Sequence, residues 1–248
     1  MFMKPAASLV TYLSSYYLGI GLKPPVPSAI SVELSAVCNL SCPECGTGTG
    51  PLLRGSEFME FSLEEKIDRA FSGKLVSVYL YYQGEPMMHP RFFDIIELFR
   101  GRRTVVSTNG HFLDRENCYR LASGSLKKII ISYDGLSQDT YGIYRRKGDH
   151  QRVKEGIYSL TEIIRQMRSS LTVELQFLAG KHNEHEISGA ADFAREVRAG
   201  FRVKSMQVLD IGRAALWVPE DMRLSRYVSS GESYRPVRTA SRGCFRMW

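Results

Sequence analysis

The feature that most constrains the fold is a regular alternation of short β-type runs with longer helical stretches. Six runs rich in Val, Ile and Tyr are expected to be strands, at residues 29–37, 75–82, 104–107, 128–132, 171–178 and 203–210. Stretches with helical spacing lie between them, at residues 62–71, 90–99, 114–122, 152–167 and 184–197. Because parallel neighbours need a covering crossover, this order predicts an α/β fold with a parallel sheet. Ligands are then expected at the carboxyl ends of the strands.

The composition is that of an ordinary globular protein. Of the 248 residues, 44% are hydrophobic and 24% are charged, which excludes a disordered chain, a collagen-like repeat and a disulfide-only scaffold. The five cysteines are odd in number, and three of them fall within eight residues. This is a poor disulfide framework for a chain of this length, so metal or cluster ligation is favoured.

The three clustered cysteines follow the first predicted strand directly. Cys38, Cys42 and Cys45 have the spacing CxxxCxxC, and thiolates are soft ligands suited to iron–sulfur clusters or zinc. A structural zinc site normally has a fourth protein ligand, and none lies nearby in sequence, since Cys118 falls in a predicted helix and Cys244 lies close to the last residue. Three local ligands therefore leave one coordination position open.

Other small polar clusters end the following strands. The second strand ends in Gln83-Gly84-Glu85-Pro86, the third in Thr108-Asn109-Gly110 and the fourth in Ser132-Tyr133-Asp134-Gly135. Turn chemistry alone explains an Asn-Gly or Asp-Gly pair equally well. The same groups, at one edge of a parallel sheet, would also suit a ribose or a carboxylate.

The cysteine spacing and the Gln-Gly-Glu-Pro turn together resemble the radical S-adenosylmethionine (radical SAM) superfamily. The resemblance implies a partial (β/α)6 barrel and a 4Fe-4S cluster held by Cys38, Cys42 and Cys45. It also implies S-adenosylmethionine as cofactor, chelating the open iron through its amino and carboxylate groups. Reductive cleavage of that cofactor would yield a 5′-deoxyadenosyl radical that removes a substrate hydrogen.

The same resemblance assigns further cofactor contacts. Gly84 and Glu85 would serve the methionine ammonium, Thr108 and Asn109 would lie near the cofactor, Ser132 would contact ribose or carboxylate, and Arg145 would pair with the methionine carboxylate. Arg146 is the rival of Arg145 for that role. Glu44 departs from the family pattern, which often has an aromatic residue just before the third cysteine. No residue is assigned to chemistry on the substrate.

The N-terminal arm, the Cys-Pro-x-Cys and Gln-Gly-Glu-Pro motifs and Ser-x-Asp-Gly look most similar to the SPASM-type subgroup of the superfamily, which includes anaerobic sulfatase maturases. This implies a peptide or protein substrate and an electron donor such as flavodoxin or ferredoxin. Residues 243–248 look like the opening of the auxiliary-cluster domain of that subgroup. We therefore expect an N-terminal arm at 1–28, a core at 29–212, and at 213–248 an irregular basic extension with an incomplete SPASM-like region.

Charge and the N-terminal segment limit partners and location. Lys and Arg number 33 and Asp and Glu 26, giving +7, and residues 213–248 carry seven Arg against three acids. The basic tail allows one alternative, a zinc-stabilised nucleic-acid-binding module. The end of the sequence at Trp248, where the auxiliary-cluster region would open, allows another, a catalytically inactive, truncated radical SAM scaffold. We nevertheless do not expect nucleic acid as a partner, because no stacking aromatics interleave the arginines. Residues 6–22 are interrupted by hydroxyl side chains, so we expect an amphipathic helix, no membrane insertion and a cytoplasmic protein.

Overall fold

The computed structural model describes residues 27–50, 57–230 and 233–237, together with the single positions 10, 14 and 17. Those three positions are helical, and the rest of the predicted arm before residue 27 lies outside the described residues. The predicted opening of an auxiliary-cluster domain at 243–248, with Cys244, also lies outside them. None of the described helices has both the length and the apolar composition needed to span a lipid bilayer.

A single parallel sheet organises the fold. Its six strands stand side by side in chain order: β1 (Ala29–Ser31), β2 (Ser77–Tyr79), β3 (Arg103–Thr108), β4 (Lys128–Ser132), β5 (Thr172–Ala179) and β6 (Gly200–Ser205). Ser132 of β4 stands beside Gln176 of β5, which in turn stands beside Arg202 of β6. The six carboxyl ends therefore meet at one edge, and the prediction of an α/β fold with a parallel, partial-barrel sheet is confirmed.

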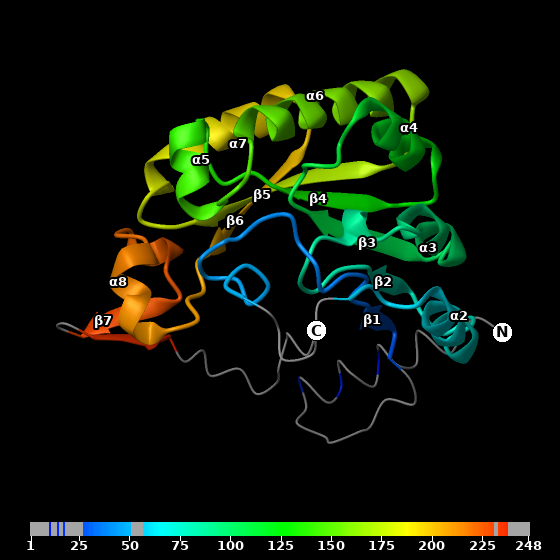
Figure 1. Cartoon of the computed structure of the whole chain (residues 1–248), viewed down its shortest axis with the longest axis horizontal. Helices are drawn as coiled ribbons and strands as arrows, with labels where there is room; N and C mark the ends of the chain where they lie inside the picture. The colour runs from blue at the N-terminus through cyan, green and yellow to red at the C-terminus, as the bar shows by residue number, and fades with distance from the viewer. Residues whose placement is uncertain are drawn as a thin grey trace.

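Helices between the strands cover the outer side of this sheet (Figure 1). They are α2 (Phe61–Ala70), α3 (Phe92–Leu98), α4 (Arg115–Ser123), α5 (Gln138–Tyr144), α6 (His150–Met167) and α7 (Ile187–Glu196), with 3-10 turns η1 (Pro86–Met88) and η2 (Glu184–Glu186). The segment that follows β1 runs along the opposite side of the sheet. That side is where the functional site lies.

Local sequence explains where these elements begin and what they bury. Asp114 and Asp149 accept hydrogen bonds from main-chain N–H groups in the first turns of α4 and α6, at 2.9 Å and 3.0 Å. Val106 of β3 and Ile129 of β4 are completely buried in the main apolar core, which they share with Ile157 of α6. Burial of these side chains is the main force that holds the helices onto the sheet.

The first two strands are shorter than predicted. They were expected at 29–37 and 75–82, but β1 ends at Ser31 and β2 spans only Ser77–Tyr79. The chain after β1 leaves the sheet, because Leu34 and Ala36 bond instead to Met59 and Glu57.

Two later parts of the chain also differ from the expectation. The sixth strand was predicted at 203–210, but β6 ends at Ser205, because the chain leaves the sheet after pairing with Ala179 of β5. Helix α5 was not predicted, although Ser137 caps it by accepting from the Thr140 N–H at 3.2 Å.

The extension after residue 212 was predicted to be irregular. It contains η3 (Ile211–Arg213), helix α8 (Ala214–Trp217), η4 (Met222–Leu224) and an antiparallel hairpin of β7 (Tyr227–Ser230) and β8 (Ser233–Pro236). These elements are too short to leave a clear periodic pattern in the sequence.

Candidate functional site

A cavity of about 800 Å³ lies at the carboxyl ends of the strands. The side chains or main chain of every predicted ligand and cofactor residue line it: Cys38, Cys42, Cys45, Gly84, Glu85, Thr108, Asn109, Ser132 and Arg145. These residues come from the loop after β1 and from the ends of β2, β3, β4 and α5. The parallel topology thus gathers positions more than 100 residues apart in sequence into one site.

The cysteine loop is held by its own main chain. The Cys45 N–H donates to the Cys42 carbonyl at 3.2 Å, and the Gly48 N–H donates to the Cys45 carbonyl at 2.9 Å. A Cβ atom at Gly48 would lie 2.4 Å from the Cys42 carbonyl oxygen, so this position needs glycine. The turn therefore presents Cys42 and Cys45 from one compact loop.

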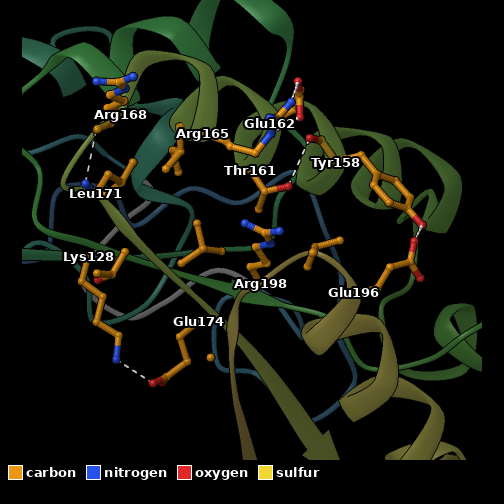
Figure 2. A pocket seen from close by; sticks show the side chains of 16 residues that line it. Lys128, Tyr158, Thr161, Glu162, Arg165, Arg168, Leu171, Glu174, Glu196 and Arg198 are labelled. Atoms are coloured by element: carbon orange, nitrogen blue, oxygen red, sulfur yellow. Dashed lines mark hydrogen bonds and ion pairs between the residues drawn. The ribbon is translucent and has the colours of Figure 1, made fainter.

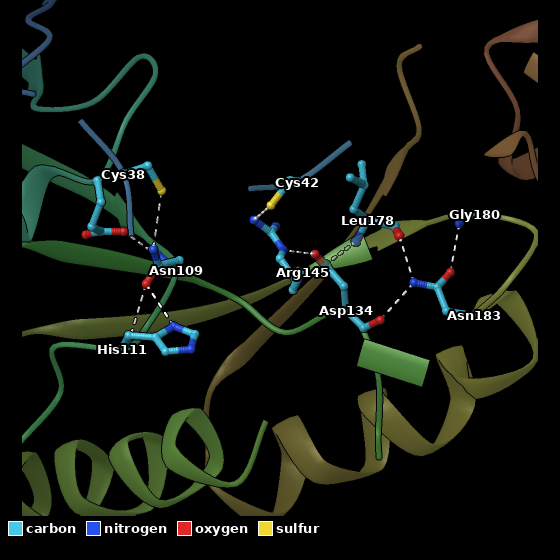
Figure 3. A network of polar contacts seen from close by, with 10 residues as sticks. Cys38, Cys42, Asn109, His111, Asp134, Arg145, Leu178, Gly180 and Asn183 are labelled. Carbon is cyan, nitrogen blue, oxygen red and sulfur yellow. Dashed lines mark hydrogen bonds and ion pairs between the residues drawn. The ribbon is translucent and has the colours of Figure 1, made fainter. Parts of the chain in front are cut away.

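The thiols lie in a partly buried environment with polar neighbours. Burial raises the pKa of Cys38 to about 11 and also raises the pKa of Cys42. Asn109 Nδ2 donates to Cys38 Sγ at 3.7 Å, and Arg145 Nη1 donates to Cys42 Sγ at 3.8 Å (Figure 3). Donors of this kind stabilise sulfur that carries negative charge, as it does when it binds a metal.

The donor set fits a cluster better than a single metal ion. Among the described residues, no three His, Cys, Asp or Glu side chains lie close enough together to share one metal ion. In a 4Fe-4S cluster each thiolate binds a different iron, so three thiols placed around a cavity suit that group.

Glu85 occupies the centre of the polar network beneath the cavity. Its Oε1 atom accepts from Thr108 Oγ1 at 2.7 Å and from the Met87 N–H at 3.0 Å, and its Oε2 atom accepts from the Asn109 N–H at 2.7 Å. The residue is 1% exposed. Burial raises the pKa of Glu85 to about 7, although the three hydrogen bonds act in the opposite direction.

Gly84 is the point at which the Glu85 turn touches the chain leading to the cysteines. Its φ is +67°, and a Cβ atom there would lie 2.0 Å from the Ser35 carbonyl oxygen and 2.8 Å from that of Val37. The next residue, Glu85, donates its N–H to the Val37 carbonyl at 2.8 Å. Glycine is therefore required here for both conformation and space.

Asn109 connects Cys38 with a histidine that sequence reasoning missed. Asn109 Nδ2 donates to Asn39 Oδ1 at 2.7 Å, while Asn109 Oδ1 lies 3.1 Å from His111 Nδ1. His111 Nε2 accepts from the Asp149 N–H at 2.8 Å, so the ring proton is on Nδ1 and donates to Asn109. Burial lowers the pKa of His111, which keeps the ring neutral. A single histidine two residues after Asn109 carries no motif that could have marked this role.

Arg145, rather than Arg146, faces the cavity. Its Nε atom lies 2.5 Å from Asp134 Oδ2, and the two side chains are 14% and 1% exposed. Asp134 Oδ1 accepts from the Leu178 N–H at 2.7 Å, and Asn183 donates to the Asp134 carbonyl at 2.9 Å (Figure 3). Burial lowers the pKa of Arg145, but the charges of Asp134 and Cys42 outweigh it, so the pKa lies above its usual value. Arg146 is exposed and does not line the cavity.

Of the remaining polar candidates, some line the cavity and one does not. Ser132 and Gln176 line the cavity, whereas Asp210 does not and instead accepts from the Gly212 N–H at 2.9 Å. Glu44 also lines the cavity and ties the cysteine loop to the segment after β6. Its Oε2 atom accepts from the Leu209 N–H at 2.8 Å, and its Oε1 atom lies 3.2 Å from Arg213 Nη1.

A second cavity, of about 900 Å³, lies by the amino ends of β4, β5 and β6 and beside α6 (Figure 2). Its lining carries charged pairs such as Lys128 with Glu174, at 2.6 Å. None of the nine predicted ligand and cofactor residues is among the described residues that line it.

The fold and the site together define a partial-barrel protein with three thiols and a polar cofactor cradle at the carboxyl edge of its sheet. The family model described as the radical SAM superfamily matches residues 32–194, which include all nine of these residues. The chain belongs to the radical SAM superfamily. Members of this family use a 4Fe-4S cluster and S-adenosylmethionine.

Comparison with individual proteins agrees with this membership. The chain is 28% identical over 177 residues to an AdoMet-dependent heme synthase of Methanosarcina barkeri, covering 70% of this chain and 48% of the relative. It is 26% identical over 209 residues to a GTP 3′,8-cyclase of Alkaliphilus oremlandii, covering 81% of this chain and 61% of the relative. The chain thus spans about half the length of the curated relatives it matches.

Solved structures with the same fold include Streptococcus suis SuiB bound to S-adenosylmethionine. Its TM-score is 0.62 at 17% identity, covering 74% of this chain and 42% of SuiB. A structure of SuiB bound to its precursor peptide SuiA matches with a TM-score of 0.60 at 16% identity, covering 73% of this chain and 40% of that chain. At these identities the likeness concerns the fold.

Proposed function

We propose that this chain is the core of an enzyme that cleaves S-adenosylmethionine reductively and uses the resulting radical to modify a peptide or protein. The observation that carries the proposal is that one cavity is lined by three thiols and by all six predicted cofactor residues. The proposed domain division remains 1–28, 29–212 and 213–248, with the last segment opening a SPASM-like region.

Cys38, Cys42 and Cys45 would hold the cluster. When bound, the cluster would supply the single electron needed for reductive cleavage of S-adenosylmethionine to a 5′-deoxyadenosyl radical. The hydrogen bonds from Asn109 and Arg145 to cysteine sulfur orient two of the thiols and offset their negative charge.

The other residues would bind the methionine and ribose groups. Arg145 is already aligned by Asp134, so its guanidinium is positioned to pair with the methionine carboxylate. Glu85 Oε1 has two donors and Oε2 has one among the described residues, which leaves Oε2 able to accept from the methionine ammonium. Gly84 allows the turn to approach closely, Thr108 and Asn109 hold Glu85, and Ser132 contacts ribose or carboxylate.

The proposal of a peptide or protein substrate is supported by a motif similarity and by a shared fold. The Cys-Pro-x-Cys and Gln-Gly-Glu-Pro wording is similar to the SPASM-type subgroup, and SuiB, which shares the fold, has been solved with a precursor peptide. The heme synthase and the GTP cyclase among the relatives define the competing substrate classes. An electron donor such as flavodoxin or ferredoxin and a reducing cytoplasm complete the proposal, because oxygen would destroy the cluster.

The test is anaerobic reconstitution of the full chain with iron and sulfide, followed by dithionite and S-adenosylmethionine. Iron near four atoms per chain and 5′-deoxyadenosine formation are the expected results. A Cys38/Cys42/Cys45→Ala variant should lose both, whereas Cys118→Ala should keep both, because Cys118 is buried away from the cavity beside the Leu113 carbonyl. A brown protein that forms no 5′-deoxyadenosine would support the inactive scaffold, and a colourless protein that retains zinc would overturn the proposal.

A further inference from the structure

One half of the cofactor cavity is lined by positive side chains that no cofactor role uses. The residues assigned to the cluster and to S-adenosylmethionine come from the loop after β1, the ends of β2 to β4, and α5. Beyond them, β6 contributes Arg202, and the residue just before β7 (Tyr227–Ser230) is Arg226; we call these two arginines the basic wall. Gln176 and Leu178 of β5 line the cavity between the two halves.

Strand geometry places Arg202 on the cavity side. Alternate residues of a strand face opposite sides of the sheet. Phe201 and Val203 pack against an apolar cluster that also contains Phe177 and Ala190 of α7, so they face the helices. Arg202 therefore faces the cavity, beside Gln176 of the neighbouring strand.

The charge of the wall is only partly neutralised by its neighbours. Arg202 Nε lies 3.2 Å from Glu174 Oε1, but the same carboxylate also pairs with Lys128 at 2.6 Å. Two positive side chains thus share one negative partner. Arg226 Nη1 donates at 2.8 Å to the side-chain oxygen of Gln207, which is neutral.

The acidic residues of the cavity do not balance the wall. Among the described lining residues these are Glu44 and Glu85. Glu85 is enclosed by three hydrogen bonds from its own part of the fold, and Glu44 pairs with Arg213. The β6 side of the cavity therefore presents excess positive charge to anything that enters beside the cofactor.

We propose that the basic wall binds an anionic oxygen group, carboxylate or phosphate, of the substrate. This rests on the proposed function, because it makes the β6 side the place where the substrate lies against S-adenosylmethionine. Arg202 and Arg226 carry planar guanidinium groups, which match carboxylate and phosphate oxygens with paired N–H donors. An acidic peptide is one substrate of this kind, and a phosphorylated molecule is the other.

Binding of simple anionic probes tests the wall directly. The full, cluster-reconstituted chain is saturated with S-adenosylmethionine without reductant, so that the methionine subsite is filled. Fluorescein-labelled tetraglutamate is then titrated by anisotropy, and inorganic pyrophosphate is titrated separately by isothermal calorimetry. The test variant is Arg202→Gln/Arg226→Gln, and the control is Arg100→Gln/Arg195→Gln. The control removes the same charge from exposed arginines that pair with Glu97 and Asp192 on the outer helices.

The expected result is that the Kd for tetraglutamate rises about tenfold or more in the test variant and changes little in the control. Binding of pyrophosphate without binding of tetraglutamate would identify phosphate as the group recognised. If neither probe binds, or if both variants weaken binding equally, the basic wall is not an anion site. Iron content and 5′-deoxyadenosine formation by the unaltered chain report on the proposed function separately, so either idea can fail alone.

Discussion

Replacing Gly84 by alanine is expected to damage both the stability of the fold and the cysteine loop. The added Cβ atom would lie 2.0 Å from the Ser35 carbonyl oxygen, whereas ordinary contact begins at 3.4 Å, so the 35–37 segment must move by about 1.4 Å. That movement would break the bond from the Glu85 N–H to the Val37 carbonyl. It would also disturb the bond between Ser35 Oγ and the same carbonyl, at 2.9 Å.

The magnitude follows from two contributions. A non-glycine residue in the left-handed region costs roughly 1–2 kcal/mol, and the two hydrogen bonds to the Val37 carbonyl, at about 1 kcal/mol each, add roughly 2 kcal/mol. The free energy of unfolding should therefore fall by about 3–4 kcal/mol. Since Val37 precedes Cys38, the iron content after reconstitution should fall as well.

Gly73 provides a matched control for this substitution. Its φ is +66°, against +67° at Gly84, but a Cβ atom there meets nothing within 4 Å. Gly73→Ala should thus cost only the conformational part, about 1–2 kcal/mol, and leave the iron content unchanged. Anaerobic urea unfolding of both variants measures the difference. Equal losses in the two variants would show that the contact between Gly84 and Ser35 does not constrain the site.

Three further predictions concern the charged groups of the cavity. The pKa of Glu85 is raised from 4.5 to about 7, so the folded state favours the protonated carboxyl; this stabilisation is full below about pH 4.5 and is lost as the pH rises through about 7. Between about pH 5 and pH 8, the unfolding free energy of the wild type should therefore fall by up to about 3 kcal/mol relative to that of Glu85→Gln. Urea titrations of both proteins across this pH range measure the difference, and parallel pH profiles would contradict the prediction. Asp134→Asn should cost about 3–5 kcal/mol of unfolding free energy at neutral pH, because it leaves the Arg145 guanidinium buried without its partner; a loss under about 1 kcal/mol would refute a buried pair. Arg145→Lys should weaken binding of S-adenosylmethionine about tenfold in calorimetry without reductant, while Arg146→Lys should not, and the reverse order would exchange their roles.

Much of the fold could be predicted because its signals are local. The apolar runs that became β3, β4 and β5 and the caps at Asp114 and Asp149 depend on residues close together in the chain. The last strand was predicted at 203–210 but lies at Gly200–Ser205. The prediction extended too far along the chain because the apolar residues after Ser205 pack around the cysteine loop rather than in the sheet. Met206 and Val208 belong to the apolar cluster that includes Leu40 and Cys42.

Part of the candidate site was also predictable from local signals, namely its cysteine loop and the polar turns at the strand ends. Cys38, Cys42 and Cys45 are close in sequence, and the polar turns end successive parallel strands, so one edge of the sheet had to collect them. The sequence by itself therefore determined the fold class, the cysteine loop and the end of the sheet at which the site lies.

Only the tertiary structure determined which side chains line the cavity and which distant residues contact one another. It placed Arg145, and not Arg146, at the cavity, where Arg145 pairs with Asp134. It also joined His111 to Asn109, and Glu44 to Leu209, which is 165 residues further along the chain. Such contacts depend on strand register, burial and the path of distant loops, none of which is recorded in the spacing of neighbouring residues. The basic wall is of this kind, because its charge matters only once β6 stands at the far side of the same cavity.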